Sequence, residues 1–149
     1  MLISSYEHSV DVKGRVFVPA KWREDLGETV AVIRGLLERD SEAKCLFGMS
    51  ESELNRLIDR IKQIAISDVE AQSALRLILA NACICEVDKQ GRILISASLR
   101  EYAGIGEDAV LVGVGTKIEI WSKANWDKYN DVYPAPTDDM LEKLRKLGV

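Results

Sequence analysis

Residues 11–27 read DVKGRVFVPAKWREDLG, and residues 88–104 read DKQGRILISASLREYAG. Seven of these seventeen aligned positions are identical, and equivalent positions lie 77 residues apart. This offset is too long for a solenoid, whose repeats of about 20–45 residues stack in arrays of three or more. The chain therefore contains two copies of one small module.

Each copy opens with the pattern Asp-x-x-Gly-Arg, which is typical of a tight turn. Aspartate suits the first position of a type I turn, and glycine at the fourth is free to take a positive φ. In the first copy, strand-like segments at 6–10 and 15–18 flank the turn, so we expect a β-hairpin with a four-residue connection. The structural turn residues are Asp11 and Gly14 in the first copy and Asp88 and Gly91 in the second.

A short helix and a second pair of strands are predicted to follow each turn. Pro19 favours a helix over 20–26 that ends at Gly27, and in the second copy Ser98 can cap the equivalent helix. The later strands are expected at 29–33 and 44–48, joined by the polar stretch 38–42, and at 109–114 and 117–121, joined by a two-residue turn at Gly115-Thr116.

Helices are predicted between the copies and after them. Capping boxes beginning at Ser50 and Ser67 each precede an apolar stripe at helical spacing, and further helical segments begin at Ser122 and Thr137. We therefore divide the chain into module 1 (5–49), a helical insert (50–80), module 2 (81–124) and a C-terminal helical tail (125–149), with the two modules sharing one core.

The composition and charge of the chain restrict the classes of function that it can have. With 20 basic and 24 acidic side chains the formal net charge is −4, so nucleic-acid binding would depend on a local basic patch. No apolar run approaches the ~20 residues that span a bilayer, and the N-terminus lacks the features of a secretory signal. The three cysteines are an odd number and favour a reducing interior over a disulfide scaffold.

Modules this short do not each close a core, so we expect the two copies to interleave around a pseudo-two-fold axis with their strands in one closed barrel. The doubled strand–Asp-x-x-Gly-Arg–strand–helix pattern with a helical insert resembles the MraZ family of bacterial transcription regulators over residues 5 to about 130. The segments that carry the resemblance are Tyr6-Glu7-His8, Gly14-Arg15-Val16, Cys85-Glu86-Val87-Asp88, Leu99-Arg100-Glu101 and Glu119-Ile120-Trp121.

The resemblance implies an α+β fold, namely an AbrB-like double-split (swapped-hairpin) β-barrel formed by two pseudo-symmetric modules, with peripheral helices. It also implies a sequence-specific DNA-binding transcriptional regulator, a repressor of cell-division and cell-wall genes. Such a protein would bind short direct repeats in a promoter as a ring-shaped homo-oligomer, and it would be cytoplasmic and nucleoid-associated. No membrane, small-molecule substrate or cofactor is expected.

The candidate DNA contacts are the basic side chains around the two turns. Residues 11–23 carry a net charge of +3 and residues 88–100 a net charge of +2. A β-ribbon fits the major groove, where arginine pairs with guanine while lysines hold phosphates. The predicted contacts are Lys13, Arg15, Lys21 and Arg23 in the first copy, with Lys89 and Arg92 as weaker candidates in the second.

Structural roles stay open for some of these residues. The Asp11/Arg15 and Asp88/Arg92 pairs recur in both copies, as expected also of salt bridges that fix the turns. Arg23 and its equivalent Arg100 are each followed by a glutamate and fit a role in the fold or in an interface better than a DNA contact. A functional alternative is a protein-binding scaffold ring with weak or no DNA binding.

A ring needs a heterologous interface between neighbours, and it would supply the avidity that a few phosphate contacts lack. The candidate interface comprises the outer faces of the 50–65 and 68–82 helices with Trp22, Trp121 and Trp126, and core packing is the alternative for each.

Catalysis and metal binding find little support. His8 is the only histidine, and it lies on a predicted strand where a satisfied or surface histidine is the usual finding. Cys83 and Cys85 point to the same side of a strand and, with Cys45 and His8, provide four thiol or imidazole ligands. The Cys-x-Cys spacing differs from the usual Cys-x₂₋₄-Cys of zinc sites. We predict no enzyme and no metal site.

Overall fold

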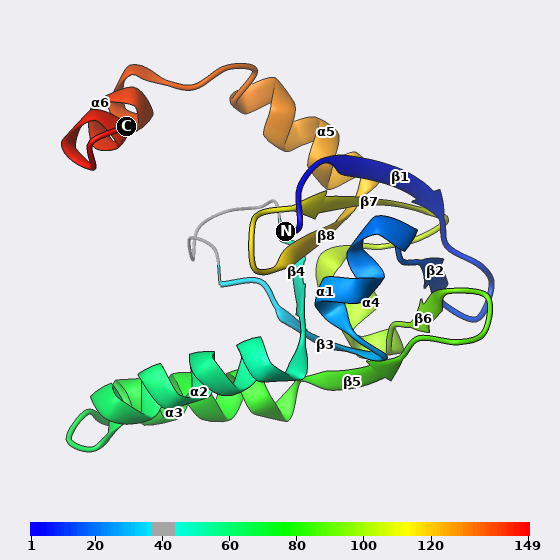
Figure 1. Cartoon of the computed structure of the whole chain (residues 1–149), viewed down its shortest axis with the longest axis horizontal. Coiled ribbons are helices and arrows are strands. Elements are labelled where there is room, and N and C mark those ends of the chain that lie inside the picture. The colour runs from blue at the N-terminus through cyan, green and yellow to red at the C-terminus, as the bar shows by residue number, and fades with distance from the viewer. Residues whose placement is uncertain (37–43) are drawn as a thin grey trace.

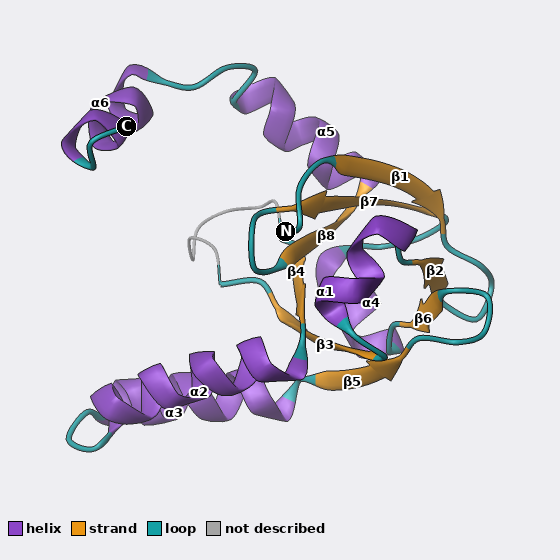
Figure 2. Cartoon of the chain, in the orientation of Figure 1, coloured by secondary structure: helices purple, strands orange, loops and turns teal. Residues whose placement is uncertain are grey.

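The computed structural model of the chain describes residues 1–36 and 44–149, so the predicted connection 38–42 lies outside the described residues. Figures 1 and 2 show the arrangement of its helices and strands. In chain order, the elements are β1 (Ser5–Ser9), β2 (Arg15–Phe17), the 3₁₀ turn η1 (Ala20–Trp22), α1 (Arg23–Leu26), β3 (Thr29–Arg34), β4 (Leu46–Met49), α2 (Glu51–Ala65), α3 (Val69–Ala80), β5 (Cys83–Glu86), β6 (Arg92–Leu94), α4 (Ala97–Ala103), β7 (Asp108–Gly113), β8 (Ile118–Ser122), α5 (Lys123–Val132) and α6 (Asp138–Lys146).

The described strands form two antiparallel sheets. The larger has the order β1-β7-β8-β4-β3-β5, and β2 pairs with β6 in a separate two-stranded ribbon. The predicted pairs over 29–33 with 44–48 and over 109–114 with 117–121 are present as β3–β4 and β7–β8. The protein is thus α+β, with antiparallel sheets and helices around them.

The predicted hairpin between 6–10 and 15–18 is wrong. The turn forms, but β1 pairs with β7, and β2 pairs with its equivalent β6 of the other copy. Val16 lies opposite Ile93 in that ribbon, and both are fully buried. A three-residue strand has few hydrogen bonds to gain by folding back, so burial of these apolar side chains between the copies decides its partner. This exchange agrees with the predicted interleaving of the copies.

One hydrophobic cluster draws on both copies. It contains Val16, Trp22 and Leu26 from the first copy and Ile93 and Leu99 from the second. A second cluster lies where strand residues such as Phe47 and Trp121 meet the helices α2, α3 and α5. Trp22 and Trp121 are each only 1% exposed. These two tryptophans are therefore core residues, as the core-packing alternative predicted for each of them, and they are not available for a ring interface.

The helix starts follow the expected capping chemistry with two corrections. Ser50, Ser122 and Thr137 cap α2, α5 and α6, each accepting a hydrogen bond from the backbone N–H three residues on. Asp68, not Ser67, caps α3, because its carboxylate accepts from the Ala71 N–H at 3.1 Å. Ser96, not Ser98, caps α4. The helix predicted over 20–26 is split into η1 and the single turn α1.

The C-terminal helices differ in how they are anchored. In α5, Trp126 and Tyr129 pack their rings against Trp121. In α6 no residue is buried, and Figure 1 shows it apart from the sheets. None of the helices within residues 1–36 and 44–149 is both long and apolar enough to cross a membrane.

Candidate nucleic-acid interface

The first turn is organised by the carboxylate of Asp11. Its Oδ1 accepts hydrogen bonds from the backbone N–H of Lys13 at 3.0 Å and of Arg15 at 2.9 Å. Its Oδ2 lies 2.5 Å from Nε of Arg15. Because these bonds favour the ionised form, the backbone N–H of Arg15 foremost, the pKa of Asp11 is lowered to about 2. Gly14 closes the turn on the Asp11 carbonyl oxygen with φ +92°.

The second turn repeats this geometry around Asp88. Its Oδ1 accepts from the backbone N–H of Gln90 and of Arg92, both at 2.9 Å, and its Oδ2 accepts from Nε of Arg92 at 2.9 Å. The pKa of Asp88 is also lowered, and the backbone hydrogen bond from Arg92 contributes most. The type I turn predicted for each Asp-x-x-Gly segment thus has the aspartate and glycine in their expected roles.

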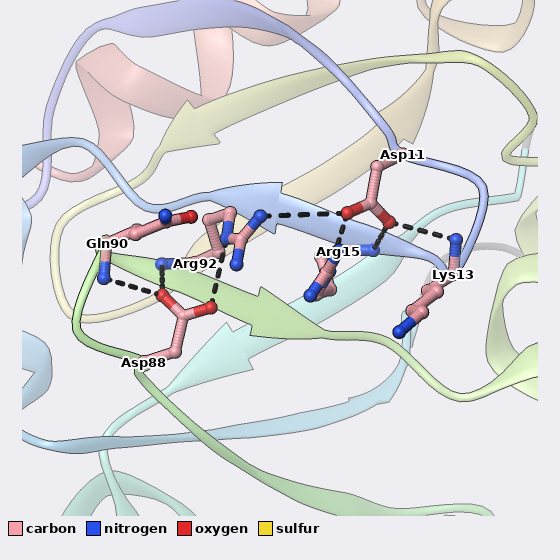
Figure 3. Close-up of polar contacts among 6 residues, drawn as sticks. All are labelled: Asp11, Lys13, Arg15, Asp88, Gln90 and Arg92. Atoms are coloured by element: carbon pink, nitrogen blue, oxygen red, sulfur yellow. Dashed lines mark hydrogen bonds and ion pairs between the residues drawn. The ribbon is translucent and has the colours of Figure 1, made fainter.

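The two turns lie at opposite ends of the short β2–β6 ribbon, and one charge contact links them. Nη1 of Arg92 lies 3.8 Å from Oδ2 of Asp11, so Arg92 faces the aspartates of both copies. Among the described residues, Arg15 forms an ion pair with Asp11 alone. Figure 3 shows this chain of contacts along the β2–β6 ribbon. The Arg15 side chain is 32% exposed and the Arg92 side chain 20%. Arg92 is therefore held more tightly as a structural ion-pair residue.

A reciprocal contact joins each helix to the turn of the other copy. A Cβ on Gly91 would collide with the guanidinium of Arg23, and one on Gly14 would collide with that of Arg100. Each guanidinium is fixed from its own copy: Nε of Arg23 donates to the Val18 carbonyl at 3.1 Å, and Nε of Arg100 donates to that of Ile95 at 3.0 Å.

Backbone hydrogen bonds complete this contact. The Val18 N–H donates to the Gly91 carbonyl at 2.8 Å, and the Ile95 N–H donates to the Gly14 carbonyl at 3.1 Å. Sequence reasoning missed this contact between the copies. The identity of both arginines and both glycines in the repeat was the available signal, but it did not reveal which residue meets which.

The predicted lysines are placed differently from the arginines. Lys13 and Lys89 lie at the exposed tips of the two turns, and Lys21 is exposed on η1. Within the part of the chain that the structure describes, none of these three ammonium groups forms an ion pair. The structure therefore places Lys13 and Arg15 at one end of the β2–β6 ribbon and Lys89 and Arg92 at the other, because Arg15 lies opposite Leu94 and Arg92 opposite Phe17.

The groups considered for catalysis or metal binding do not converge. His8 packs its ring against Tyr6 and Phe17, at centroid distances of 6.4 and 6.2 Å. Cys45 belongs to the second hydrophobic cluster, whereas Cys83 and Cys85 pack with the first. Outside residues 37–43, no three His, Cys, Asp or Glu side chains are placed to hold a metal ion together.

The chain is thus a protein of two copies of one module, which share an exchanged ribbon with a basic turn at each end and flank a helical insert. The family profile "MraZ protein, putative antitoxin-like" matches the chain twice, over residues 1–77 and 78–142. "Transcriptional regulator MraZ" of Caldicellulosiruptor bescii is 44% identical over 149 residues, and that of Alkaliphilus oremlandii is 41% identical over 149 residues; both alignments cover 100% of each chain.

The chain belongs to the MraZ family of transcriptional regulators and carries two MraZ repeats. The resemblance identified from the repeated motif is confirmed. The family consists of regulators and not of enzymes. A solution structure of a Pyrococcus horikoshii protein aligns with 80% of this chain and 88% of its own, at 16% identity and a TM-score of 0.35.

Proposed function

We propose that this protein is a sequence-specific DNA-binding regulator that represses cell-division and cell-wall genes from the nucleoid, in the cytoplasm. It binds short direct repeats in a promoter through the paired turn tips of its two modules. Its strands close into a swapped-hairpin barrel that holds these tips in a fixed relation. The observation that carries the proposal is the pair of turns, one at each end of the β2–β6 ribbon, that present Lys13 and Lys89 to solvent.

The basic side chains at the two ends of the ribbon suit a DNA duplex better than the rest of the molecule does. The chain as a whole is acidic, yet Lys13 and Lys89 are free of ion pairs among the described residues. Lysines placed in this way neutralise phosphates, and arginines beside them can reach guanine edges in the major groove. We assign the phosphate contacts to Lys13, Lys21 and Lys89, and the base contact to Arg15.

In this proposal Arg23 and Arg92 have structural roles and do not contact DNA. Arg23 acts as a positioning residue, because its guanidinium lies against Gly91 and fixes the second turn. Arg92 bridges Asp88 and Asp11 and so holds the two tips together. For either arginine to contact DNA, it would first have to break its contacts with these partners.

A single pair of tips offers too few cations for tight binding, so several protomers must act together. We propose a homo-oligomeric ring whose protomers engage successive repeats, which multiplies weak contacts through a high effective concentration. The interface would use apolar residues that the single chain leaves exposed on the helical insert, such as Ile64, Val69 and Leu77.

The experiment selects binding sites from a random duplex library with the full chain and then measures affinity for the enriched site over a salt series. We expect enrichment of direct repeats and a steep salt dependence. Lys13→Gln should reduce the slope of log K against log salt by about 0.9 for each protomer whose Lys13 contacts a phosphate. The control Lys128→Gln changes another exposed lysine, on α5, and should leave the slope unchanged.

Equal slopes for Lys13→Gln and Lys128→Gln would exclude the turn tips as the DNA surface. Absence of any enriched sequence, together with an intact oligomer, would favour the scaffold ring instead. Light scattering on the same samples gives the oligomeric state, so a failure to assemble is distinguished from a failure to bind.

A further inference from the structure

Cys83 and Cys85 form a close pair of thiols on β5. Residues two apart on a strand point to the same face, and here Sγ of Cys85 donates to Sγ of Cys83 across 3.6 Å. Neither sulfur has a task in the DNA-binding surface described above. The third cysteine, Cys45, is buried in the other hydrophobic cluster and is separate from this pair.

The two thiols differ in access. Cys83 is half-buried and Cys85 is only 4% exposed, so Cys83 is the more exposed residue of the pair. Burial raises the pKa of the Cys85 thiol to about 12, with the neighbouring Cys83 contributing further. Cys85 therefore keeps its proton at neutral pH and directs it at the Cys83 sulfur. We therefore expect Cys83 to react with an oxidant first and Cys85 to react with the oxidised Cys83.

We propose that Cys83 and Cys85 are a redox-active dithiol that a hydroperoxide oxidises to an intramolecular disulfide. The Cys83 thiolate attacks the terminal oxygen of the hydroperoxide, the O–O bond breaks, and the alkoxide leaves and takes a proton as an alcohol. The resulting sulfenic acid on Cys83 is attacked by the sulfur of Cys85. The S–S bond forms, the S–O bond breaks, and the hydroxyl leaves with the Cys85 proton as water.

The strand makes such a disulfide strained and therefore reversible. Two residues of an extended strand span about 6.6 Å, close to the upper limit of about 6.8 Å between the Cα atoms of a disulfide. Closing the bond must shorten β5 between the two cysteines. Strained disulfides are easily reduced, which is typical of regulatory pairs in a reducing compartment.

The position of β5 allows this distortion. It is an end strand of the larger described sheet and pairs only with β3, where Cys85 lies opposite Val30 and Cys83 opposite Val32. One edge of β5 is thus free of sheet pairing, and the strand can bend away from that side.

The test treats the full-length protein with hydrogen peroxide, quenches, denatures it, alkylates the remaining thiols and digests it with trypsin. Cleavage after Arg76 and Lys89 leaves both cysteines in one peptide, residues 77–89. We expect this peptide to lose two hydrogen atoms and to escape alkylation, while Cys45 is alkylated. Millimolar glutathione should restore both thiols.

Two variants assign the steps. Cys85→Ser should stop at a sulfenic acid on Cys83 that dimedone traps, and Cys83→Ser should leave Cys85 reduced, as judged by the alkylated peptide. Cys45→Ser is the matched control and should form the disulfide as fast as the unmodified chain. Disulfides between chains, direct conversion of Cys83 to the sulfinic acid, or fully alkylated 77–89 after peroxide would each overturn the proposal. None of these readouts depends on DNA binding.

Discussion

The two Asp-x-x-Gly-Arg turns have the same hydrogen-bonding geometry and different electrostatic surroundings. In each turn the aspartate accepts from two backbone N–H groups and pairs with the arginine four residues on. The first turn carries Lys13 where the second has Gln90, and the second carries Lys89 where the first has Val12. Both modules therefore need the fold of the turn, while each has its own pattern of charge at the tip.

The arginines of the two turns, Arg15 and Arg92, differ further in the number of carboxylates that they face. Arg92 faces two aspartates, at 2.9 and 3.8 Å, and Arg15 faces one. An arginine held by two carboxylates must lose more on turning to DNA than one held by a single carboxylate. Under the proposed function, the first copy supplies the arginine that contacts DNA, and the second uses its arginine chiefly to join the modules.

The largest expected effect comes from the glycines that both turns share. Gly14→Ala and Gly91→Ala should each lower the free energy of unfolding by about 1–3 kcal/mol, because a side chain at positive φ is strained. The new Cβ would also push Arg100 or Arg23 away from its carbonyl partner. Denaturant unfolding measures both variants.

Gly106→Ala is the matched control, since the backbone at Gly106 has no positive φ and open space surrounds the site of the Cβ. Its unfolding midpoint should stay near that of the unmodified chain. Measuring the cost of Gly14→Ala again in an Arg100→Ala background separates the backbone strain from the collision, because the guanidinium that the new Cβ would meet is absent there. Equal stability of Gly14→Ala and Gly106→Ala would show that the reciprocal contact does not matter.

The next largest effect distinguishes the proposed DNA contact of Arg15 from the structural role of Arg92. Arg15→Ala should weaken binding to the selected DNA about tenfold, the equivalent of about 1.4 kcal/mol for one lost base contact. Arg92→Ala should weaken it less and should lower stability more than Arg15→Ala does, because Arg92 joins both turns. Affinity titrations paired with unfolding curves compare the two variants. A larger loss of affinity in Arg92→Ala than in Arg15→Ala would place the base contact in the second copy.

Local features of this chain were accessible from the sequence, and contacts between the copies were not. The turn at Asp11 was predictable because its hydrogen bonds reach only four residues along the chain. The same holds for the Ser50 cap. The partner of β2 was not predictable from the turn alone, because the buried faces of Val16 and Ile93, far apart in sequence, decide it.

The residues of the candidate site also fall into those that the sequence indicated and those that only the structure identified. Lys13 and Lys89 were found from their place beside a turn, since charged residues at such tips are solvent-exposed. The repeated arginine at positions 23 and 100 was noticed, but its partner glycine lies in the other module and no local pattern indicates it. Long-range packing therefore had to be seen to separate a positioning arginine from a DNA contact.

The smallest expected effect concerns pH and separates the two aspartates. The pKa of folded Asp11 is about 2, below its ordinary value of 3.8, so the stability that it contributes is complete above about pH 4 and is lost as the pH falls towards 2. The pKa of Asp88 is lowered in the same direction. Asp11→Asn should therefore flatten the decline of stability between pH 4 and 2 more than Asp88→Asn does, because Asp11 also faces Arg92. Urea unfolding at intervals across that range measures the slopes, with Asp131→Asn on the exposed end of α5 as control. If Asp131→Asn flattened the curve as much as Asp11→Asn, the turn carboxylate would have no special share in acid stability.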